Sequence, residues 1–231
     1  MKVINLEQGS EKWFEYKWGR LGGSTVKHIK SDKRNDTFFN ILSQLRRDFE
    51  IEESFTNDAM LRGTMLEDDG CDYLSSYTGI DFQKQGVWEY NKYFSVSPDR
   101  ANKDLTIACE HKAPSPKTHA KYIYNGIIPE EHLDQCVSYF VANENLKELY
   151  FISYCPEDLY QQGFIIHIDL NTEFEVKKKR FKTLKNGELG KSTESYLENI
   201  KLSDIVKELK ESVDNFSEEL DSEISSIRQK F

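Results

Sequence analysis

Two short motifs, Ser97-Pro98-Asp99 and Glu110-His111-Lys112, contain residue types that hold a divalent metal ion and activate water. Alternate residues of a β-strand share a face, so Glu110 and Lys112 would project together while the His111 side chain points to the opposite face. The His111 backbone carbonyl would still lie beside them. If Asp99 reaches the same point, two carboxylates and one carbonyl supply the hard oxygen ligands suited to Mg²⁺ or Mn²⁺.

This donor set indicates phosphodiester hydrolysis. A bound metal ion lowers the pKa of a coordinated water and neutralises charge on the scissile phosphate. The Lys112 ammonium would stand beside that water and orient or deprotonate it. A purely structural alternative also fits, because short motifs recur by chance. In that alternative Asp99 closes a turn after Pro98, and Glu110 and Lys112 form an exposed ion pair on one strand.

A third acidic residue, Glu67, ends the segment Arg62-Gly63-Thr64-Met65-Leu66-Glu67, on a predicted helix that precedes the strands. From there it could join the metal site directly or through a water molecule. Asp68 and Asp69 follow, so Glu67 taken alone also fits a solvated acidic turn.

The order of the motifs resembles one known family. Between residues 8 and 156 the chain shows W-F…G-R-x-G-G-S, R-G-x-x-x-E, S-P-D, E-x-K-x-P and a downstream helical glutamine. This succession is similar to the lambda-type phage exonucleases, also called the YqaJ-like viral recombinase family. The resemblance implies an α/β fold with a restriction-endonuclease-like PD-(D/E)xK core. It also implies a Mg²⁺-dependent enzyme of phage-type recombination that digests one strand of linear duplex DNA from a 5′ end and leaves 3′ single-stranded tails.

The resemblance implies roles for residues of the catalytic centre. Asp99 and Glu110 match the family's metal ligands, and Lys112 matches its catalytic lysine. Glu67 matches the helix-borne acidic residue, and Gln135 matches the active-site glutamine. Mg²⁺ is the expected cofactor, with Mn²⁺ able to substitute for it.

Lys17 and Ser24 match the family positions that hold the terminal 5′-phosphate. Ser24 follows Gly22-Gly23 and is predicted to N-cap a helix, where a hydroxyl and free backbone N–H groups would face an anion. Three positions depart from the family pattern. Arg100 stands where glycine is usual, Val137 where a second glutamine is frequent, and Lys17 where arginine is common.

Several rival functions share part of this pattern. A RecB-like or CRISPR-associated nuclease and an endonuclease would have the same fold. The four cysteines, at positions 71, 109, 136 and 155, form no CxxC pair, which speaks against an iron–sulfur-bearing member and predicts reduced, buried thiols. A non-catalytic DNA-end-binding or assembly module, with Arg100 disturbing the metal pocket, is a second kind of rival. A scaffold protein whose final helix recruits a partner is a third.

Composition limits the remaining classes. The 231 residues, 38% of them hydrophobic, suffice for one substantial core. A net charge of −9, from 31 basic and 40 acidic residues, argues against a polycationic DNA coat or a membrane-surface peptide. The N-terminus lacks a secretory pattern, and the apolar runs are too short to cross a bilayer. We therefore expect a cytoplasmic protein without membrane partners, in a bacterial host if a phage encodes it.

The expected partners are the ends of double-stranded DNA. By resemblance to the family, the chain would form a homo-oligomer, a ring-shaped trimer, and would work with a single-strand annealing recombinase.

The elements that must position these residues are read from periodicity and turn residues. Helices are predicted at residues 11–18, after Ser24, and at 37–50 and 56–78, the last ending at Thr78-Gly79. Residues 85–89, 93–96 and 105–112 alternate as three strands. Helices follow at 117–125 and 130–143, and strands at 148–154 and 163–169. The prediction is a central mixed sheet flanked by helices.

Long helices are predicted from there to the C-terminus. Basic residues at 177–180 would lie on a helix face that is solvated or contacts DNA phosphates. In the final helix, apolar residues recur at three- and four-residue steps at Val206, Leu209, Val213, Phe216, Leu220, Ile224 and Ile227. Residues 1–190 are interpreted as the nuclease domain. Residues 191–231 are interpreted as a helical extension that packs on this domain or in a subunit interface.

Overall fold

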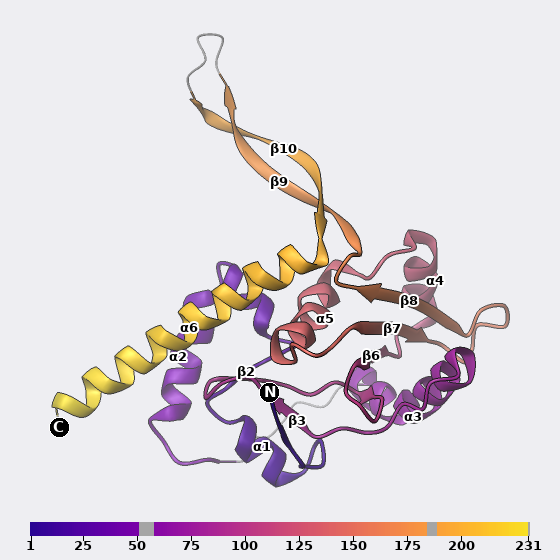
Figure 1. Cartoon of the computed structure of the whole chain (residues 1–231), viewed down its shortest axis with the longest axis horizontal. Helices are drawn as coiled ribbons and strands as arrows, with labels where there is room; N and C mark the ends of the chain where they lie inside the picture. The colour runs from indigo at the N-terminus through magenta and orange to yellow at the C-terminus, as the bar shows by residue number, and fades with distance from the viewer. Residues whose placement is uncertain (51–57, 184–188, 231) are drawn as a thin grey trace.

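The computed structural model describes residues 1–50, 58–183 and 189–230, with the backbone alone for residues 177–183, 189–194 and 228–230. Two four-stranded sheets form the body of the molecule, and a two-stranded hairpin projects from it (Figure 1). The first sheet has the order β1 (Lys2–Ile4), β3 (Val87–Glu89), β4 (Phe94–Val96) and β2 (Leu21–Gly22). β3 and β4, which lie within the predicted strands 85–89 and 93–96, pair antiparallel.

The second sheet carries the predicted chemistry. Its order is β5 (Arg100–Ala101), β6 (Ile107–Lys112), β7 (Glu148–Tyr154) and β8 (Gly163–Asp169). β5 and β8 are antiparallel to their neighbours, whereas β6 and β7 are parallel. Parallel neighbours need a long crossover connection. Here α4 (Pro116–Asn125) and α5 (Glu130–Ala142) provide it. The predicted mixed sheet flanked by helices is therefore confirmed.

Local sequence accounts for the ends of several helices. α1 (Glu11–Lys17) begins after Ser10, whose hydroxyl accepts a hydrogen bond from the Trp13 backbone N–H. α4 begins with Ser115 as N-cap and ends at Gly126 in the left-handed conformation. The other helices of the body are η1 (Val26–Lys30), α2 (Arg34–Leu45) and α3 (Asp58–Thr78).

The two faces of the second sheet are covered by different helices. Alternate residues of β6 and β7, including Ala108 and Phe151, belong to the main core together with α5. The intervening residues, including Cys109 and Ile152, pack with α3 in a smaller cluster. α3 approaches β6 closely at Gly70, where a Cβ atom would lie 2.3 Å from His111 Nε2. A larger side chain at Gly70 would push α3 away from the sheet.

The prediction of helix for the residues before Leu202 is wrong. β9 (Glu173–Thr183) and β10 (Leu189–Lys201) pair antiparallel and form the projecting hairpin (Figure 1). Lys and Glu favour helix in isolation, but cross-strand pairing along nearly the whole length of β9 overrides that preference. The basic residues at 177–180 therefore lie on a strand rather than a helix. The boundary predicted at residue 190 falls inside β10.

The final helix, α6 (Leu202–Lys230), packs on the body of the molecule as one of the two predicted alternatives. Leu209, Val213, Phe216 and Leu220 are buried against α5, α2 and η1, which agrees with their helical spacing. All four cysteines are buried free thiols, as predicted. No helix in the described part of the chain is long and apolar enough to cross a membrane.

Candidate active site

Asp99 and Glu110 meet because β5 and β6 form an antiparallel pair. Arg100 faces Cys109 in the register of this pair, which sets the preceding Asp99 opposite Glu110. The His111 backbone N–H donates a 2.6 Å hydrogen bond to the Asp99 carboxylate. The N–H and C=O of one strand residue point to the same edge. The His111 carbonyl therefore also points to the β5 edge of β6, where Asp99 lies opposite Glu110.

Lys112 and Glu110 lie on the same face of β6, and the Lys112 ammonium donates a hydrogen bond to Glu110 Oε1. The Glu110 side chain is 0% exposed, and that of Lys112 is 27% exposed. Burial lowers the pKa of Lys112, but the negative charges of Glu110 and Asp99 outweigh it and raise the pKa above its usual range. The ammonium is therefore held in its charged form. An exposed strand ion pair, the structural alternative, does not describe a buried carboxylate.

The charge balance of this cluster favours a cation. Burial, together with the charge of Glu110, raises the pKa of Asp99 well above its usual range. Two carboxylates face the single ammonium of Lys112, which leaves one negative charge uncompensated, and uncompensated charge in a buried site is costly. Oxygen donors from two carboxylates and the His111 carbonyl fit the preference of Mg²⁺. Within the described residues, no three side chains of His, Cys, Asp or Glu lie close enough together to hold a metal ion.

Glu67 lies on α3, on the other side of the second sheet. Burial raises its pKa, and its negative charge contributes to the raised pKa of Asp99. Glu67 is therefore within electrostatic reach of the site, although it does not complete a compact group of three carboxylates. The alternative of a fully solvated acidic turn does not fit its partial burial on a continuous helix.

Gln135 reaches the site through a residue that the sequence motifs did not indicate. The Gln135 side-chain amide donates to the Tyr139 hydroxyl at 3.3 Å, and this hydroxyl donates a hydrogen bond to Glu110 Oε2. Tyr139 is buried one turn after Gln135 on α5, so both side chains point to the same face of the helix. The four-residue spacing from Gln135 was the only sequence signal for Tyr139.

Lys17 lies at the end of α1, next to the first sheet. Its ammonium donates to the Ser95 carbonyl at 2.8 Å and to the Ser95 hydroxyl at 3.3 Å. No carboxylate among the described residues forms an ion pair with it. Burial and the nearby charge of Arg20 lower the pKa of Lys17 to about 8. An anionic ligand beside this ammonium would favour its charged form.

The prediction that Ser24 caps a helix is wrong. Ser24 is exposed in the turn after β2, and Thr25 occupies the N-cap position of the five-residue 3₁₀ helix η1. The Thr25 hydroxyl bonds both the N–H and the C=O of Gly22, which tightens this turn. A Cβ atom on Gly22 would lie 3.6 Å from the Lys17 ammonium, so the turn that carries Ser24 adjoins Lys17.

The same turn adjoins α5. A Cβ atom on Gly23 would lie 2.9 Å from Ser138 Oγ and 3.7 Å from Gln135 Cγ. The turn of residues 22–24 therefore lies between Lys17 and the helix whose Gln135 and Tyr139 lead to Glu110. Lys17 and Gln135 therefore form one continuous region with Asp99, Glu110 and Lys112.

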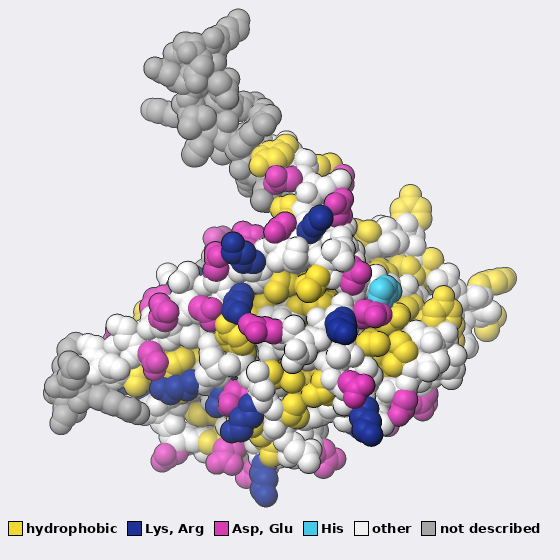
Figure 2. Space-filling model, viewed as in Figure 1, with side chains coloured by type: hydrophobic (Ala, Val, Ile, Leu, Met, Phe, Trp, Pro, Cys, Tyr) yellow, Lys and Arg dark blue, Asp and Glu magenta, His cyan; other side chains and the backbone are white. Residues whose placement is uncertain are grey.

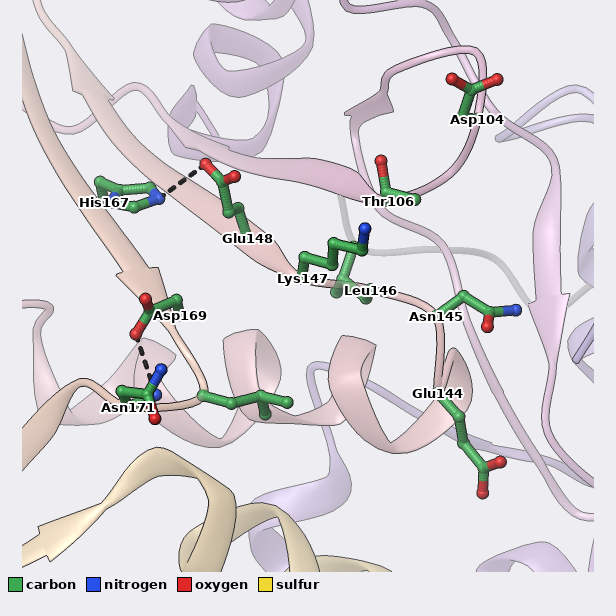
Figure 3. Close-up of a pocket in the computed structure, with 11 residues that line it drawn as sticks. Asp104, Thr106, Glu144, Asn145, Leu146, Lys147, Glu148, His167, Asp169 and Asn171 are labelled. Atoms are coloured by element: carbon green, nitrogen blue, oxygen red, sulfur yellow. Dashed lines mark hydrogen bonds and ion pairs between the residues drawn. The ribbon is translucent and has the colours of Figure 1, made fainter.

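A surface pocket of about 780 Å³ lies elsewhere, at the opposite end of the second sheet (Figure 3). Glu148, which begins β7, and Asp169, which ends β8, line it together with His167. Glu148 faces Ile107 at the start of β6, about 16 Å along the strand from Lys112 at roughly 3.3 Å per residue. The pocket is therefore separate from the Glu110 cluster.

Comparisons with known proteins place the fold. No protein-family model and no curated protein matches the sequence. An alkaline exonuclease from Laribacter hongkongensis superposes with a TM-score of 0.71 at 24% identity, covering 96% of this chain and 97% of that one. Its complex with dAMP gives a TM-score of 0.70 with the same identity and coverage.

A phage related exonuclease from Haemophilus somnus 129PT superposes with a TM-score of 0.53 at 12% identity, covering 89% of this chain and 96% of that one. The resemblance predicted from the motifs is thus confirmed at the level of the fold. This chain has the fold of these exonucleases.

Proposed function

We propose that this protein is a Mg²⁺-dependent exonuclease that digests one strand of linear double-stranded DNA from the 5′ end. The observation that carries the proposal is the joining of Asp99, Glu110, the His111 carbonyl and Lys112 at one edge of the sheet. Structural likeness to exonucleases along nearly the whole chain supports it. The 5′-to-3′ polarity and a role in phage-type recombination follow from the motif resemblance.

Different residues of the chain would bind the metal ion, orient its ligands and position the water. Asp99, Glu110 and the His111 carbonyl would hold Mg²⁺, with Glu67 as an additional carboxylate. When bound, Mg²⁺ supplies charge neutralisation on the phosphate and an acidified water. Tyr139 and Lys112 each donate to one oxygen of Glu110 and so fix its orientation. Lys112 also presents its ammonium to the nucleophilic water, which it positions, and Gln135 holds the Tyr139 hydroxyl in place.

Lys17 is proposed to hold the terminal 5′-phosphate, with the exposed Ser24 hydroxyl beside it. We expect Lys17→Ala to reduce the preference for 5′-phosphorylated ends over 5′-hydroxyl ends. In the wild type this preference should fall as the pH rises through about 8, because the free ammonium then loses its proton. Lys17→Arg should keep the preference across this range, since a guanidinium stays charged. Cleavage rates on both kinds of end, from pH 7 to 9, test the role.

A role for Lys17 in folding alone would reduce cleavage equally on phosphorylated and hydroxyl ends. It would also leave the ratio of the two rates independent of pH. Either result contradicts phosphate binding at this position.

Tyr139→Phe removes the hydrogen bond to Glu110 Oε2 and keeps the buried ring. Partners that orient a metal ligand typically contribute about 10- to 100-fold to activity or metal affinity. We therefore expect cleavage to fall by about 10-fold or more, and the Mg²⁺ concentration for half-maximal rate to rise. Tyr90→Phe is the matched control, because it removes a tyrosine–carboxylate hydrogen bond to Asp214 on α6. Equal rates for the two variants would contradict the role of Tyr139.

The proposed partners are double-stranded DNA ends, further copies of this chain in a ring-shaped trimer, and a single-strand annealing recombinase. We expect these partners to meet in the cytoplasm, which is that of a bacterial host if a phage encodes the chain.

Both charge types are interspersed on the face that Figure 2 shows, without a broad basic patch. A trimeric mass in light scattering is the expected result, and a monomeric mass would contradict the ring.

The decisive experiment follows label release from linear duplex DNA in Mg²⁺ and in EDTA. The DNA carries label at the 5′ or the 3′ end, with or without a 5′-phosphate, and a closed circle is the control. We expect Mg²⁺-dependent loss of the 5′ label from linear DNA only, fastest with a 5′-phosphate. Cutting of the circle would indicate an endonuclease of the same fold. Binding of ends by folded protein without cleavage would indicate a non-catalytic end-binding module.

A further inference from the structure

Helix α3, which carries Glu67, is anchored to the second sheet on both sides of that residue. Before Glu67, the Arg62 guanidinium forms two 2.6 Å hydrogen bonds with the Glu157 carboxylate. Arg62 Nε also donates to the backbone carbonyls of Ala113 and Pro114, in the loop that follows Lys112. After Glu67, the close approach at Gly70 seats the helix on His111.

The anchor nearest to Glu67 is an ion pair between Arg100 and Asp68. Arg100 directly follows Asp99, and Asp68 directly follows Glu67, so the pair joins the two chain segments one residue away from both carboxylates. The Arg100 side chain is only 11% exposed, whereas that of Asp68 is 62% exposed. The exposed Lys84 ammonium contacts the same carboxylate at 2.8 Å.

The burial of Arg100 makes this pair different from an ordinary surface ion pair. An exposed pair contributes little, but loss of the partner of a buried charge leaves that charge uncompensated. Among the described residues, Asp68 is the only carboxylate that pairs with this guanidinium. The buried Arg100 Nε has no hydrogen-bond partner among them. Arg100 is also close enough to lower the pKa of Glu67 by its charge.

We propose that Arg100 is a positioning residue that acts through Asp68 to hold Glu67 beside the Asp99–Glu110 edge, so that Glu67 takes part in binding the divalent metal ion. The inference rests on the proposed function, in which Glu67 is an additional carboxylate of the metal site. It explains why the chain places a buried arginine next to Asp99, where the resembled family usually has glycine.

The test measures Mn²⁺ binding to the DNA-free protein by calorimetry, alongside cleavage of linear duplex DNA in Mg²⁺. Asp68→Asn breaks the ion pair and leaves the buried Arg100 charge without its carboxylate, whereas Arg100→Ala removes the guanidinium and its charge together, and circular dichroism checks that each variant is folded. We expect both variants to bind Mn²⁺ about 10- to 100-fold more weakly, the usual effect of losing a group that orients a metal site. Arg100→Lys should recover most of the affinity, because it keeps the charge.

The same substitutions in a Glu67→Gln background test whether Arg100 acts through Glu67. The effects of substitutions at residues that act as one unit are not additive, so each added substitution should then weaken Mn²⁺ binding by less than about 2-fold. Arg34→Ala is the matched control, since it breaks an arginine–carboxylate pair with Glu219 on α6. Losses that are equal with and without Glu67, or no larger than in the control, overturn the proposal. Tighter Mn²⁺ binding by Arg100→Ala also overturns it, since the guanidinium would then only repel the ion.

Failure of the proposed function is distinguishable in the same experiment. A wild-type protein that does not cleave DNA contradicts the exonuclease. The Mn²⁺ titrations of the variants still decide whether Arg100 acts through Glu67.

Discussion

Lys112→Ala is expected to reduce the proposed Mg²⁺-dependent cleavage of linear DNA by about 10²- to 10⁴-fold, the usual contribution of a group that positions or activates a nucleophile. The reason is that Lys112 is the only cation in contact with the Glu110 carboxylate among the described residues, and its side chain is partly exposed toward solvent. The negative charges of Glu110 and Asp99 keep it protonated, so it presents a fixed ammonium.

Single-turnover cleavage rates and circular dichroism test this expectation together. Lys210→Ala is the matched control, because Lys210 forms a 2.7 Å ion pair with the exposed Glu144, at the opposite end of the second sheet from Lys112. The control should cleave at the wild-type rate. A folded Lys112→Ala variant that retains a rate within about 2-fold of wild type would contradict the assignment.

Asp99→Asn is expected to have opposite effects on activity and on stability. Loss of a carboxylate that is proposed to hold Mg²⁺ should reduce cleavage by about 10³-fold, comparable to the removal of one essential electrostatic group from an active site. In EDTA, however, the variant should be more stable than the wild type at neutral pH. Burial and the charge of Glu110 disfavour the ionised form of Asp99, and asparagine removes that ionisation while retaining an oxygen that accepts from the His111 N–H.

The sign of the pH dependence follows from the raised pKa of Asp99. The folded state holds the proton more firmly than the unfolded state, whose aspartate pKa is about 3.9. The contribution of Asp99 to stability is therefore fully present at low pH, and it is lost as the pH rises through the raised folded-state pKa. The stability of the two proteins should converge as the pH falls toward about 4 and diverge above it.

Thermal unfolding midpoints in EDTA and in Mg²⁺, measured from pH 4 to 8, check both parts of this expectation. Mg²⁺ should raise the midpoint of the wild type and leave that of Asp99→Asn unchanged, because only a protein that binds the ion gains stability from it. A wild type that is more stable than the variant in EDTA at pH 7 to 8 would contradict the account of Asp99 as a strained buried carboxylate.

The sequence by itself determined the local geometry of the site. The two-residue period of a strand was sufficient to place Glu110 and Lys112 on one face of β6 and His111 on the other. The order of the motifs predicted the fold of the exonucleases, and helical periodicity predicted the buried stripe of α6. These features depend on neighbours within one element or on motif order, which can be read directly from the residues.

Only the tertiary structure decided which distant groups meet at that site. The register of β5 and β6 brings Asp99 to Glu110, and the packing of α5 brings the Tyr139 hydroxyl to the same carboxylate. Arg100 stood out in the sequence only as a departure from a family pattern. Its partner Asp68 lies on α3, which packs on the face of the second sheet opposite the Glu110 side chain. Such contacts join residues many positions apart, so no spacing along the chain encodes them.

The projecting hairpin shows the same limit from the opposite direction. The charged residues of β9 and β10 favour helix locally, and only the pairing of the two strands makes them extended. The contacts formed on folding also determine the N-cap of η1. The Thr25 hydroxyl bonds Gly22, and Thr25 rather than Ser24 takes the cap position. Local propensities differ by less than about 1 kcal/mol per residue, so the contacts formed on folding decide between them.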